Sequence, residues 1–551
     1  MNAASAGTVS YLDGSGHSDR SDGLGGWLGS LDHKRIGLMY LAVILAAFLL
    51  GSSFALVLRT EMLSPARTVV DRGIFQKLFT MHGIVMLFLC VLPGIPAALG
   101  NFVLPLMLGA ANLAYPRLNR LGFHFYLVGV GCVLLATLVG ALDTGWTFLP
   151  PLSDQAGAPL VILAAGLHLL ALSVVFTGLN FLVTIVWRRP AGMTWFRLPL
   201  LPWLLLATSI LQIVTTPILA ALALLLLAGQ FTAGSLFGPT DGNDPLTYQH
   251  FFWFFAHAAI FLVILPGIGV VSEVLATFCR KPVFGYRQTA VAGLVLAALA
   301  PVAYGVHLIA SGQSPEASTV FSLLALLTCV PATIIGFNLL ATLYEGSIQP
   351  DTPLLYGLAF LMQVAVGGLS GLFLSSLATG VYLHGTYFQL ANLHYLLAGG
   401  GLTGFLAGLY YWWPKLSGRL YNERWGKIGA GLIFFGFNLA FLTKFFLGSQ
   451  GMLQRQYDYA EQFVSLQVLS SVGAYLLGFG LLIVAVNLIH AWLHGRPAPA
   501  NPWGGVTLEW SCPSPPPAEN FAEPPQVTDL YDFRGQTYDP ESGGFVKAQE
   551  V

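Results

Sequence analysis

Charged residues and cysteines are both scarce in this chain. Lys, Arg, Asp and Glu make up 9% of its 551 residues, whereas a soluble protein carries about 25%. The net charge of −1 gives no indication of a nucleic-acid partner. The five cysteines form no CxxC or other metal-binding spacing, and most fall in or beside apolar segments. The composition therefore argues against a soluble protein, a disulfide framework and a thiolate metal site.

Long apolar blocks take the place of charge. Hydrophobic residues make up 55% of the chain, and each block is long enough to cross a hydrocarbon core about 30 Å thick. A lipid-facing β-barrel needs alternating segments of about ten residues instead. We therefore predict an all-α membrane protein with about twelve transmembrane helices, over residues 36–58, 79–108, 121–142, 158–187, 196–229, 250–279, 288–311, 318–346, 353–378, 386–412, 426–449 and 463–494.

Basic residues in the loops predict the orientation. Fifteen Lys and Arg residues fall on one side of these spans and six on the other, and the more basic side faces the cytoplasm. Both termini are then cytoplasmic, and the lipid bilayer surrounds residues 31–496. We expect residues 1–30, rich in Gly, Ser and Asp, to be flexible. The Pro-rich residues 497–551 are expected to form an extended cytoplasmic tail without a core of its own.

Seven histidines lie inside the predicted spans, away from the first and last residues of each span. Ionisable residues at membrane depth are costly and usually mark cofactor, ion or proton sites. Any one buried histidine is equally well explained as a neutral imidazole hydrogen-bonded to a neighbouring helix. His124 and His490 are the weakest candidates, because both fall near helix ends. Two opposed imidazoles from different helices are also what a low-spin heme iron needs. The seven are His82, His124, His168, His257, His307, His394 and His490.

The sequence around these histidines resembles subunit I of the heme–copper oxidases, of the cytochrome c oxidase type. Matching segments run in the family's order from about residue 30 to residue 525. They include LDHKRIGLMY, FTMHGIVMLFL, DTGWTFLPPLS, ILPGIGVVSE, HGTYFQLANLHY, YYWWPKLSGR and NPWGGVTLEWSCPSPPP. The resemblance implies a twelve-helix bundle in a cytoplasmic, and here bacterial, membrane.

The resemblance implies that the low-spin heme site is retained. The family's two axial ligands correspond to His82 and His394. Arg59 corresponds to the arginine that contacts a formyl group, and Trp146 to a tryptophan near this heme. Of an arginine pair over the heme propionates only Arg455 remains, because Gln454 takes the other position. We therefore expect one bis-histidine heme, of the a or the b type.

The family's oxygen-reducing centre is altered at several positions. The ligand of the second heme corresponds to Asn392, a poor iron ligand. Two of the three copper ligands remain, as His257 and His307, while the third is Val306. Two imidazoles hold copper weakly, so copper is not expected and the pair is interpreted as vestigial. The tyrosine that the family cross-links to a copper ligand is Phe261.

The positions that move protons in the family are also changed. The channel lysine corresponds to Ile335, the glutamate near the centre to Ala259, and the aspartate at the other channel mouth to Asn112. The segment that helps to bind magnesium reads His384-Gly385-Thr386-Tyr387 and lacks its carboxylate.

Three functions are compatible with this pattern. The first is an electron-transfer or structural subunit of a respiratory complex, with one heme, no catalytic residues and no oxygen chemistry of its own. Its partners are expected to be subunit II- or III-like chains and an electron-donor cytochrome or a quinone. The second is a genuine terminal oxidase or nitric-oxide-type reductase with an altered site. The third is a heme-free scaffold subunit.

Overall fold

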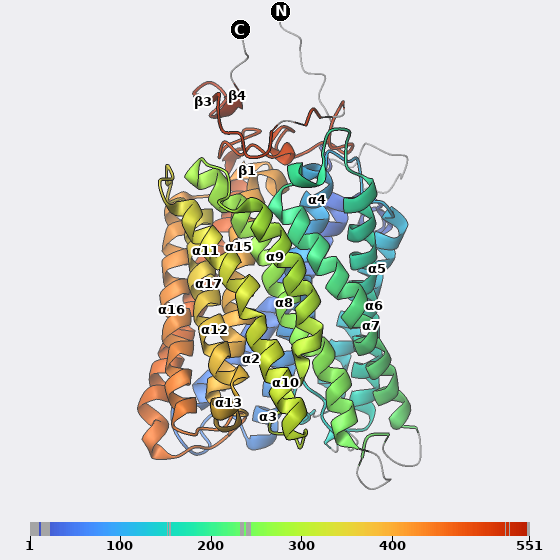
Figure 1. The fold of residues 1–551 in the computed structure, drawn as a ribbon, viewed down its shortest axis with the longest axis vertical. Helices are drawn as coiled ribbons and strands as arrows, with labels where there is room; N and C mark the ends of the chain where they lie inside the picture. Colours follow the sequence, from blue (N-terminus) through green and yellow to red (C-terminus); the bar gives the residue numbers. More distant parts are fainter. Residues whose placement is uncertain are drawn as a thin grey trace, which may run out of the picture.

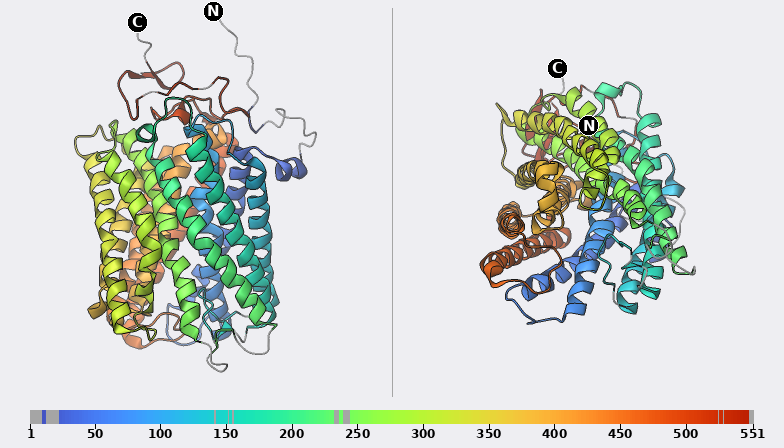
Figure 2. Two further views of the ribbon diagram at one scale, coloured as in Figure 1. Left: turned by 45° about the vertical axis from the view of Figure 1, so that its right-hand side comes forward. Right: turned by 60° about the horizontal axis from the view of Figure 1, so that its bottom comes forward.

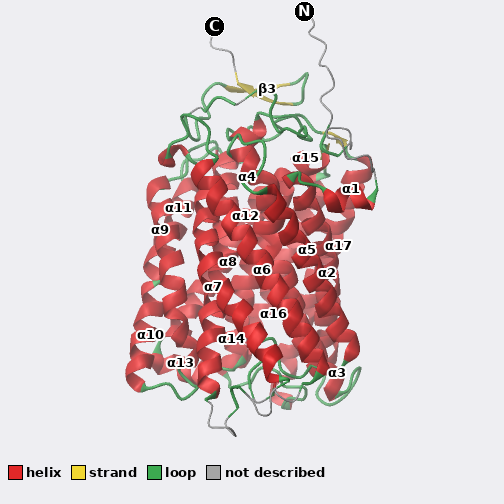
Figure 3. Ribbon diagram, turned by 90° about the vertical axis from the view of Figure 1, so that its right-hand side faces the viewer, coloured by secondary structure: helices red, strands yellow, loops and turns green. Residues whose placement is uncertain are grey.

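A computed structural model describes residues 10–12, 23–140, 142–150, 152–153, 156–231, 236–238, 244–523, 525–527 and 529–547. Long helices run side by side along one axis (Figures 1 and 2). The short strands and most loops lie at the two ends of this bundle (Figure 3). Described segments from both ends of the chain, the helix α1 (Leu24–Gly29) and the hairpin β3–β4, lie at the same end of the bundle (Figures 1 and 3).

Eleven of the described helical segments are long and apolar enough to cross a membrane. A twelfth crossing is continuous through α14 (Tyr387–Leu393), η7 (His394–Gly400) and α15 (Gly401–Ser417), because the backbone stays helical at both junctions. The prediction of about twelve spans in an all-α membrane protein is confirmed. The eleven are α2 (His33–Glu61), α3 to α4 (Arg72–Met107), α5 (Pro116–Val139), α6 (Ala158–Trp187), α7 (Leu200–Gly229), α8 (Pro245–Cys279), α9 with η6 (Tyr286–Leu308), α10 with α11 (Pro315–Leu343), α12 (Thr352–Ser375), α16 (Glu423–Ser449) and η8 with α17 (Glu461–His494).

Some crossings contain π-helical or 3-10 turns, in which the hydrogen-bonding pattern departs from that of an α-helix. π-Helical turns are rare and often occur at functional positions. The third helix passes from α3 (Arg72–Ile84) through η1 (Val85–Val91) and η2 (Gly94–Gly100) into α4 (Asn101–Met107). The segment η7 begins at His394, and η6 (Ala300–Leu308) is 3-10 and carries His307. His307 and His394 thus lie in irregular turns, and His82 lies three residues before one.

The remaining elements are short and lie between or beyond the crossings. They are η4 (Trp195–Arg197), α13 (Leu377–Leu383), β1 (Arg419–Leu420), β2 (Arg496–Pro497), η9 (Leu508–Trp510), β3 (Gln536–Asp539) and β4 (Gly544–Lys547). The strands form two antiparallel pairs, β1 with β2 and β3 with β4.

The C-terminal tail packs across one end of the bundle. Trp510, Cys512 and Tyr531 are buried and belong to the same hydrophobic core as the helices. The Lys415 ammonium donates to the carbonyl of Ala500 at 2.8 Å and to that of Cys512. The tail therefore adds to the core of the bundle.

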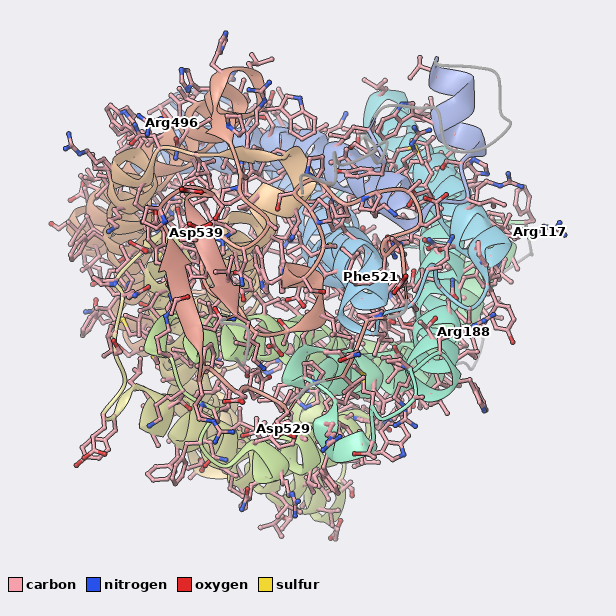
Figure 4. The ribbon with its side chains drawn as sticks, turned by 90° about the horizontal axis from the view of Figure 1, so that it is seen from above. Arg117, Arg188, Arg496, Phe521, Asp529 and Asp539 are labelled. Atoms are coloured by element: carbon pink, nitrogen blue, oxygen red, sulfur yellow. The ribbon has the colours of Figure 1, made fainter. Side chains whose placement is uncertain are left out.

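Parts of the first thirty residues are also fixed in place. Tyr11 is buried, and its hydroxyl donates to the Leu416 carbonyl at 2.6 Å. Ser10 forms an isolated bridge with Pro517 in the tail. Arg117, Arg188 and Arg496 lie at this end of the molecule (Figure 4). Because these residues belong to the more basic side, this end is the one predicted to face the cytoplasm.

Candidate functional site

His82 lies in the last turn of α3 and faces α2. Its Nδ1 is 2.9 Å from the carbonyl oxygen of Gly51. That contact requires a proton on Nδ1, so the Nε2 lone pair is free to bind a metal ion. The same hydrogen bond fixes the plane of the ring.

His394 is the first residue of η7, in the helix expected to supply the second ligand. Its Nδ1 is 2.8 Å from the Leu390 carbonyl oxygen, which again leaves the Nε2 lone pair free. The imidazole stacks on Phe441 of α16, with ring centres 4.3 Å apart and an angle of 20° between the planes. A backbone acceptor and an aromatic neighbour therefore both hold this ring.

The two imidazoles are suited to hold an iron ion between them. They come from different crossings, and each keeps an Nε2 lone pair that is free to bind a metal ion. Both side chains are only partly buried although they lie inside the bundle, which is expected of residues that line internal space. Neutral imidazoles with the proton on Nδ1 are the usual form of histidine ligands to metals. The residues present therefore fit a bis-histidine heme.

Trp146 lies next to the His82 helix. A Cβ placed on Gly83 is only 3.0 Å from the Cβ of Trp146, so α3 meets the Trp146 side chain at a glycine. The indole also packs against Phe252 and Trp253 of α8, with ring centres 5.5 and 6.1 Å apart. The structure thus places Trp146 against Gly83, the residue that follows His82.

Arg59 is buried at the end of α2 and is held by α17. Its Nη2 donates to the Gln467 carbonyl, to Gln467 Oε1 and to Ser471 Oγ at 2.8 to 2.9 Å. Its Nε has no acceptor among the described residues. This guanidinium is therefore fixed in position, and its buried Nε–H is still free to donate a hydrogen bond.

Arg455 lies in the loop after α16, where its backbone has a φ of 64°. It donates to the carbonyl of Asp143 and pairs with its carboxylate at 3.0 Å, and it also reaches Gln76. Burial lowers the pKa of the guanidinium, and Asp143 opposes this shift. Asp143 precedes Trp146 by three residues, so the loop that carries Arg455 is tied to the Trp146 segment.

The two remaining copper-ligand positions face each other. His257 Nδ1 of α8 is 3.0 Å from His307 Nε2 of η6. His307 also stacks on Trp253, with ring centres 4.0 Å apart, and Phe261 packs edge-on against His257. Among the described residues, no group of three or more His, Cys, Asp or Glu side chains is arranged to hold a metal ion.

Asn392 points into α12. Its Nδ2 donates to the Gly367 carbonyl at 2.7 Å and to Ser370 Oγ at 3.0 Å. Both amide hydrogens are therefore used in linking α14 to α12.

Sequence reasoning overlooked Lys444 and Phe441, one turn apart on α16. Phe441 stacks on His394, and the Lys444 ammonium lies over the Phe441 ring, 4.3 Å from its centre. Lys444 was counted only as one of the six basic residues of the less basic side. A lysine inside an apolar block is itself the signal that identifies it, because such residues are rare at membrane depth.

These features are those of a polytopic membrane protein whose interior can hold a heme between two helices. The chain belongs to the family described as Cytochrome C and Quinol oxidase polypeptide I, whose model matches residues 35–476. The resemblance found in the sequence motifs is confirmed at the level of the family.

Relatives match nearly the whole chain. The cytochrome c oxidase subunit 1 of Synechocystis is 39% identical over 91% of this chain and 92% of its own. The protein of the same name from Thermostichus vulcanus is 37% identical over 92% of each. A solved heme-copper terminal oxidase dimer contains a chain with a TM-score of 0.69 and 17% identity, covering 84% of both chains. This last likeness concerns the fold alone.

Proposed function

We propose that this protein is an oxidase-subunit-I-like membrane subunit that binds one low-spin heme through His82 and His394 and carries electrons without an oxygen-reducing centre of its own. The observation that carries the proposal is the contrast between His394 and Asn392. The two side chains belong to one helix, two residues apart. His394 keeps a free Nε2, whereas the Asn392 amide is bonded to Gly367 and Ser370.

The Asn392 contacts argue against a second axial heme ligand from this helix. The Asn392 side chain is a neutral amide, and its Nδ2 already donates two hydrogen bonds to α12. To reach an iron ion, the side chain has to give up both interhelical hydrogen bonds. Burying polar groups without partners costs about 1–3 kcal/mol in proteins.

The low-spin site retains what an electron carrier requires. A bound bis-histidine heme supplies a one-electron redox couple. His82 and His394 fix its orientation, Trp146 lines the His82 side, and Arg59 and Arg455 supply positive charge. The expected partners are other subunits of an oxidase-type complex, of the subunit II or III kind. An electron donor such as a cytochrome or a quinone is also expected, because the relatives are named cytochrome c oxidase.

A genuine oxidase with an altered site is the second candidate. The relatives carry the name of a cytochrome c oxidase subunit over nearly the full length of the chain, which favours this candidate. His257 Nδ1 and His307 Nε2, 3.0 Å apart, also have the spacing of two ligands on one small metal ion. Bonds of about 2.0 Å at an angle near 100° give that separation. This candidate needs a third copper donor and a non-histidine ligand for a second heme.

A heme and metal count on the purified protein tests the proposal. The pyridine hemochrome spectrum gives the number and type of hemes, carbon monoxide reveals an open iron site, and elemental analysis measures copper. We expect one heme per chain, no spectral change with carbon monoxide and no stoichiometric copper. Two hemes with copper and oxygen uptake contradict the proposal and establish an oxidase, whereas a chain without heme is a scaffold.

His394→Ala locates the heme. We expect the variant to lose the reduced-minus-oxidised signal, because one axial ligand is gone. His168→Ala is the matched control, since His168 also lies in a membrane helix with its Nδ1 3.0 Å from a backbone carbonyl, that of Ala220. The control should keep the full signal. Equal signals in the two variants contradict the assignment.

A further inference from the structure

Two basic side chains, Arg59 and Lys444, are buried on the helices that contact His82 and His394. Gly51 of the Arg59 helix accepts a hydrogen bond from His82, and Phe441 of the Lys444 helix stacks on His394. In the described part of the chain, no ion pair joins either of them to an Asp or Glu side chain. A buried charge without a counter-charge costs several kcal/mol. Such an arrangement is explained if a bound group brings the negative charge.

Lys444 is the less satisfied of the two. The Arg59 guanidinium donates three hydrogen bonds to α17, but the Lys444 ammonium has no acceptor among the described residues. Among the described residues, its one close partner is the face of Phe441, 4.3 Å from the ring centre. A cation over an aromatic face gains less than its desolvation costs. Packing alone therefore does not account for a lysine here.

The position of Lys444 connects it to the heme ligand. Its ammonium lies over Phe441, 4.3 Å from the centre of the ring. Phe441 in turn stacks on His394, with ring centres 4.3 Å apart. The ammonium is thus separated from the axial imidazole by one aromatic ring. A fixed positive charge this close to an iron ligand acts strongly on the iron, because the surroundings are apolar.

We propose that Lys444 is a positioning residue of the low-spin heme. Its ammonium, together with Arg59, supplies counter-charge to the negatively charged substituents of the heme and favours the reduced over the oxidised iron. Reduction adds one electron and hence one negative charge to the heme. A nearby cation therefore stabilises the reduced form and raises the reduction potential. This inference rests on the proposed function, since it requires a heme at His82 and His394.

The test is a spectroelectrochemical titration of the purified, heme-loaded protein. Lys444→Gln should lower the ratio of reduced to oxidised heme about tenfold at the potential where the unmodified heme is half reduced. This is the effect of one unit charge at roughly 10 Å in a medium of effective dielectric constant about 20. Lys444→Arg keeps the charge, so its ratio of reduced to oxidised heme should stay within about twofold of that of the unmodified protein.

Lys427→Gln is the matched control. Lys427 belongs to the same helix but pairs with Asp351 at 3.2 Å near its other end. This variant should leave the reduction of the heme unchanged. A Lys444→Gln protein that holds its heme and titrates like the unmodified protein overturns the inference.

Lys444→Met keeps the inference testable if Lys444→Gln does not accumulate. Without heme, Met should make the protein more stable than Lys, because the desolvation cost is removed. With heme, it should lower heme content or reproduce the loss of reduced heme. A Lys444→Met protein with full heme content and an unchanged titration shows a purely structural role and overturns the inference. Absence of heme from the unmodified protein overturns both proposals, whereas a heme insensitive to residue 444 overturns this one alone.

Discussion

Replacement of Asn392 by alanine tests whether the side-chain amide links two helices or binds an iron ion. In the structure the Asn392 amide donates to the Gly367 carbonyl and to Ser370 Oγ, and both acceptors are on α12. Side-chain hydrogen bonds between membrane helices average about 0.6 kcal/mol and reach about 1.7 kcal/mol. Two of them give a loss of about 1–2 kcal/mol in the free energy of unfolding.

The assay combines stability with heme content. Denaturation of the detergent-solubilised protein measures the loss in stability, and the pyridine hemochrome spectrum gives heme per chain. We expect Asn392→Ala to be destabilised but to keep the same heme content as the unmodified protein. A double-mutant cycle with Ser370→Ala should give a coupling of about 0.6 kcal/mol, because it isolates one of the two hydrogen bonds. Loss of half of the heme in Asn392→Ala refutes the reasoning, since it makes Asn392 the ligand of a second heme.

Two further substitutions test packing and charge. Gly83→Ala should destabilise the protein by about 1–3 kcal/mol and alter the electron paramagnetic resonance spectrum of the low-spin heme, because the new methyl group lies 3.0 Å from Trp146 Cβ. Gly131→Ala, where a Cβ meets no atom of the described residues within 4 Å, should change neither. Burial raises the pKa of Glu509 in the tail, and its Oε2 has no partner among the described residues. The folded state then binds this proton more tightly than the unfolded state, so stability is greatest below the ordinary glutamate pKa and falls as pH rises through the raised value. Glu509→Gln cannot ionise, so its thermal midpoint should fall less between pH 5 and pH 8 than that of the unmodified protein. An equal fall in the two proteins contradicts the role of Glu509.

The predicted spans agree closely with the helices, and the reason is local. A helix that crosses a hydrocarbon core must satisfy its backbone hydrogen bonds internally and present apolar side chains to the lipid. Its length and composition can therefore be predicted from the sequence of that segment alone. The block predicted at 158–187 is α6 (Ala158–Trp187). The block predicted at 386–412 begins one residue before α14, although the helix then continues to Ser417.

The candidate residues could be named from sequence, because the motifs that carry them are contiguous. The structure brings His257 and His307 into contact and places Trp146 beside Gly83. The assignment of His82 and His394 as the heme ligands remains a prediction that the heme count tests. Lys444 is visible in the sequence as a lysine inside an apolar block, and Phe441 is one turn away from it, but the sequence gives no indication that His394 stacks on Phe441.

The sequence by itself determined the class of protein, the number and limits of the crossings, and the family. Each of these depends on the composition and order of residues along single segments. Only the tertiary structure decided which nitrogen of each histidine is engaged, where the Asn392 amide points, and that Lys444 lies above the Phe441–His394 stack. These features depend on hydrogen bonds and ring contacts between helices far apart in the chain, which composition and spacing do not specify.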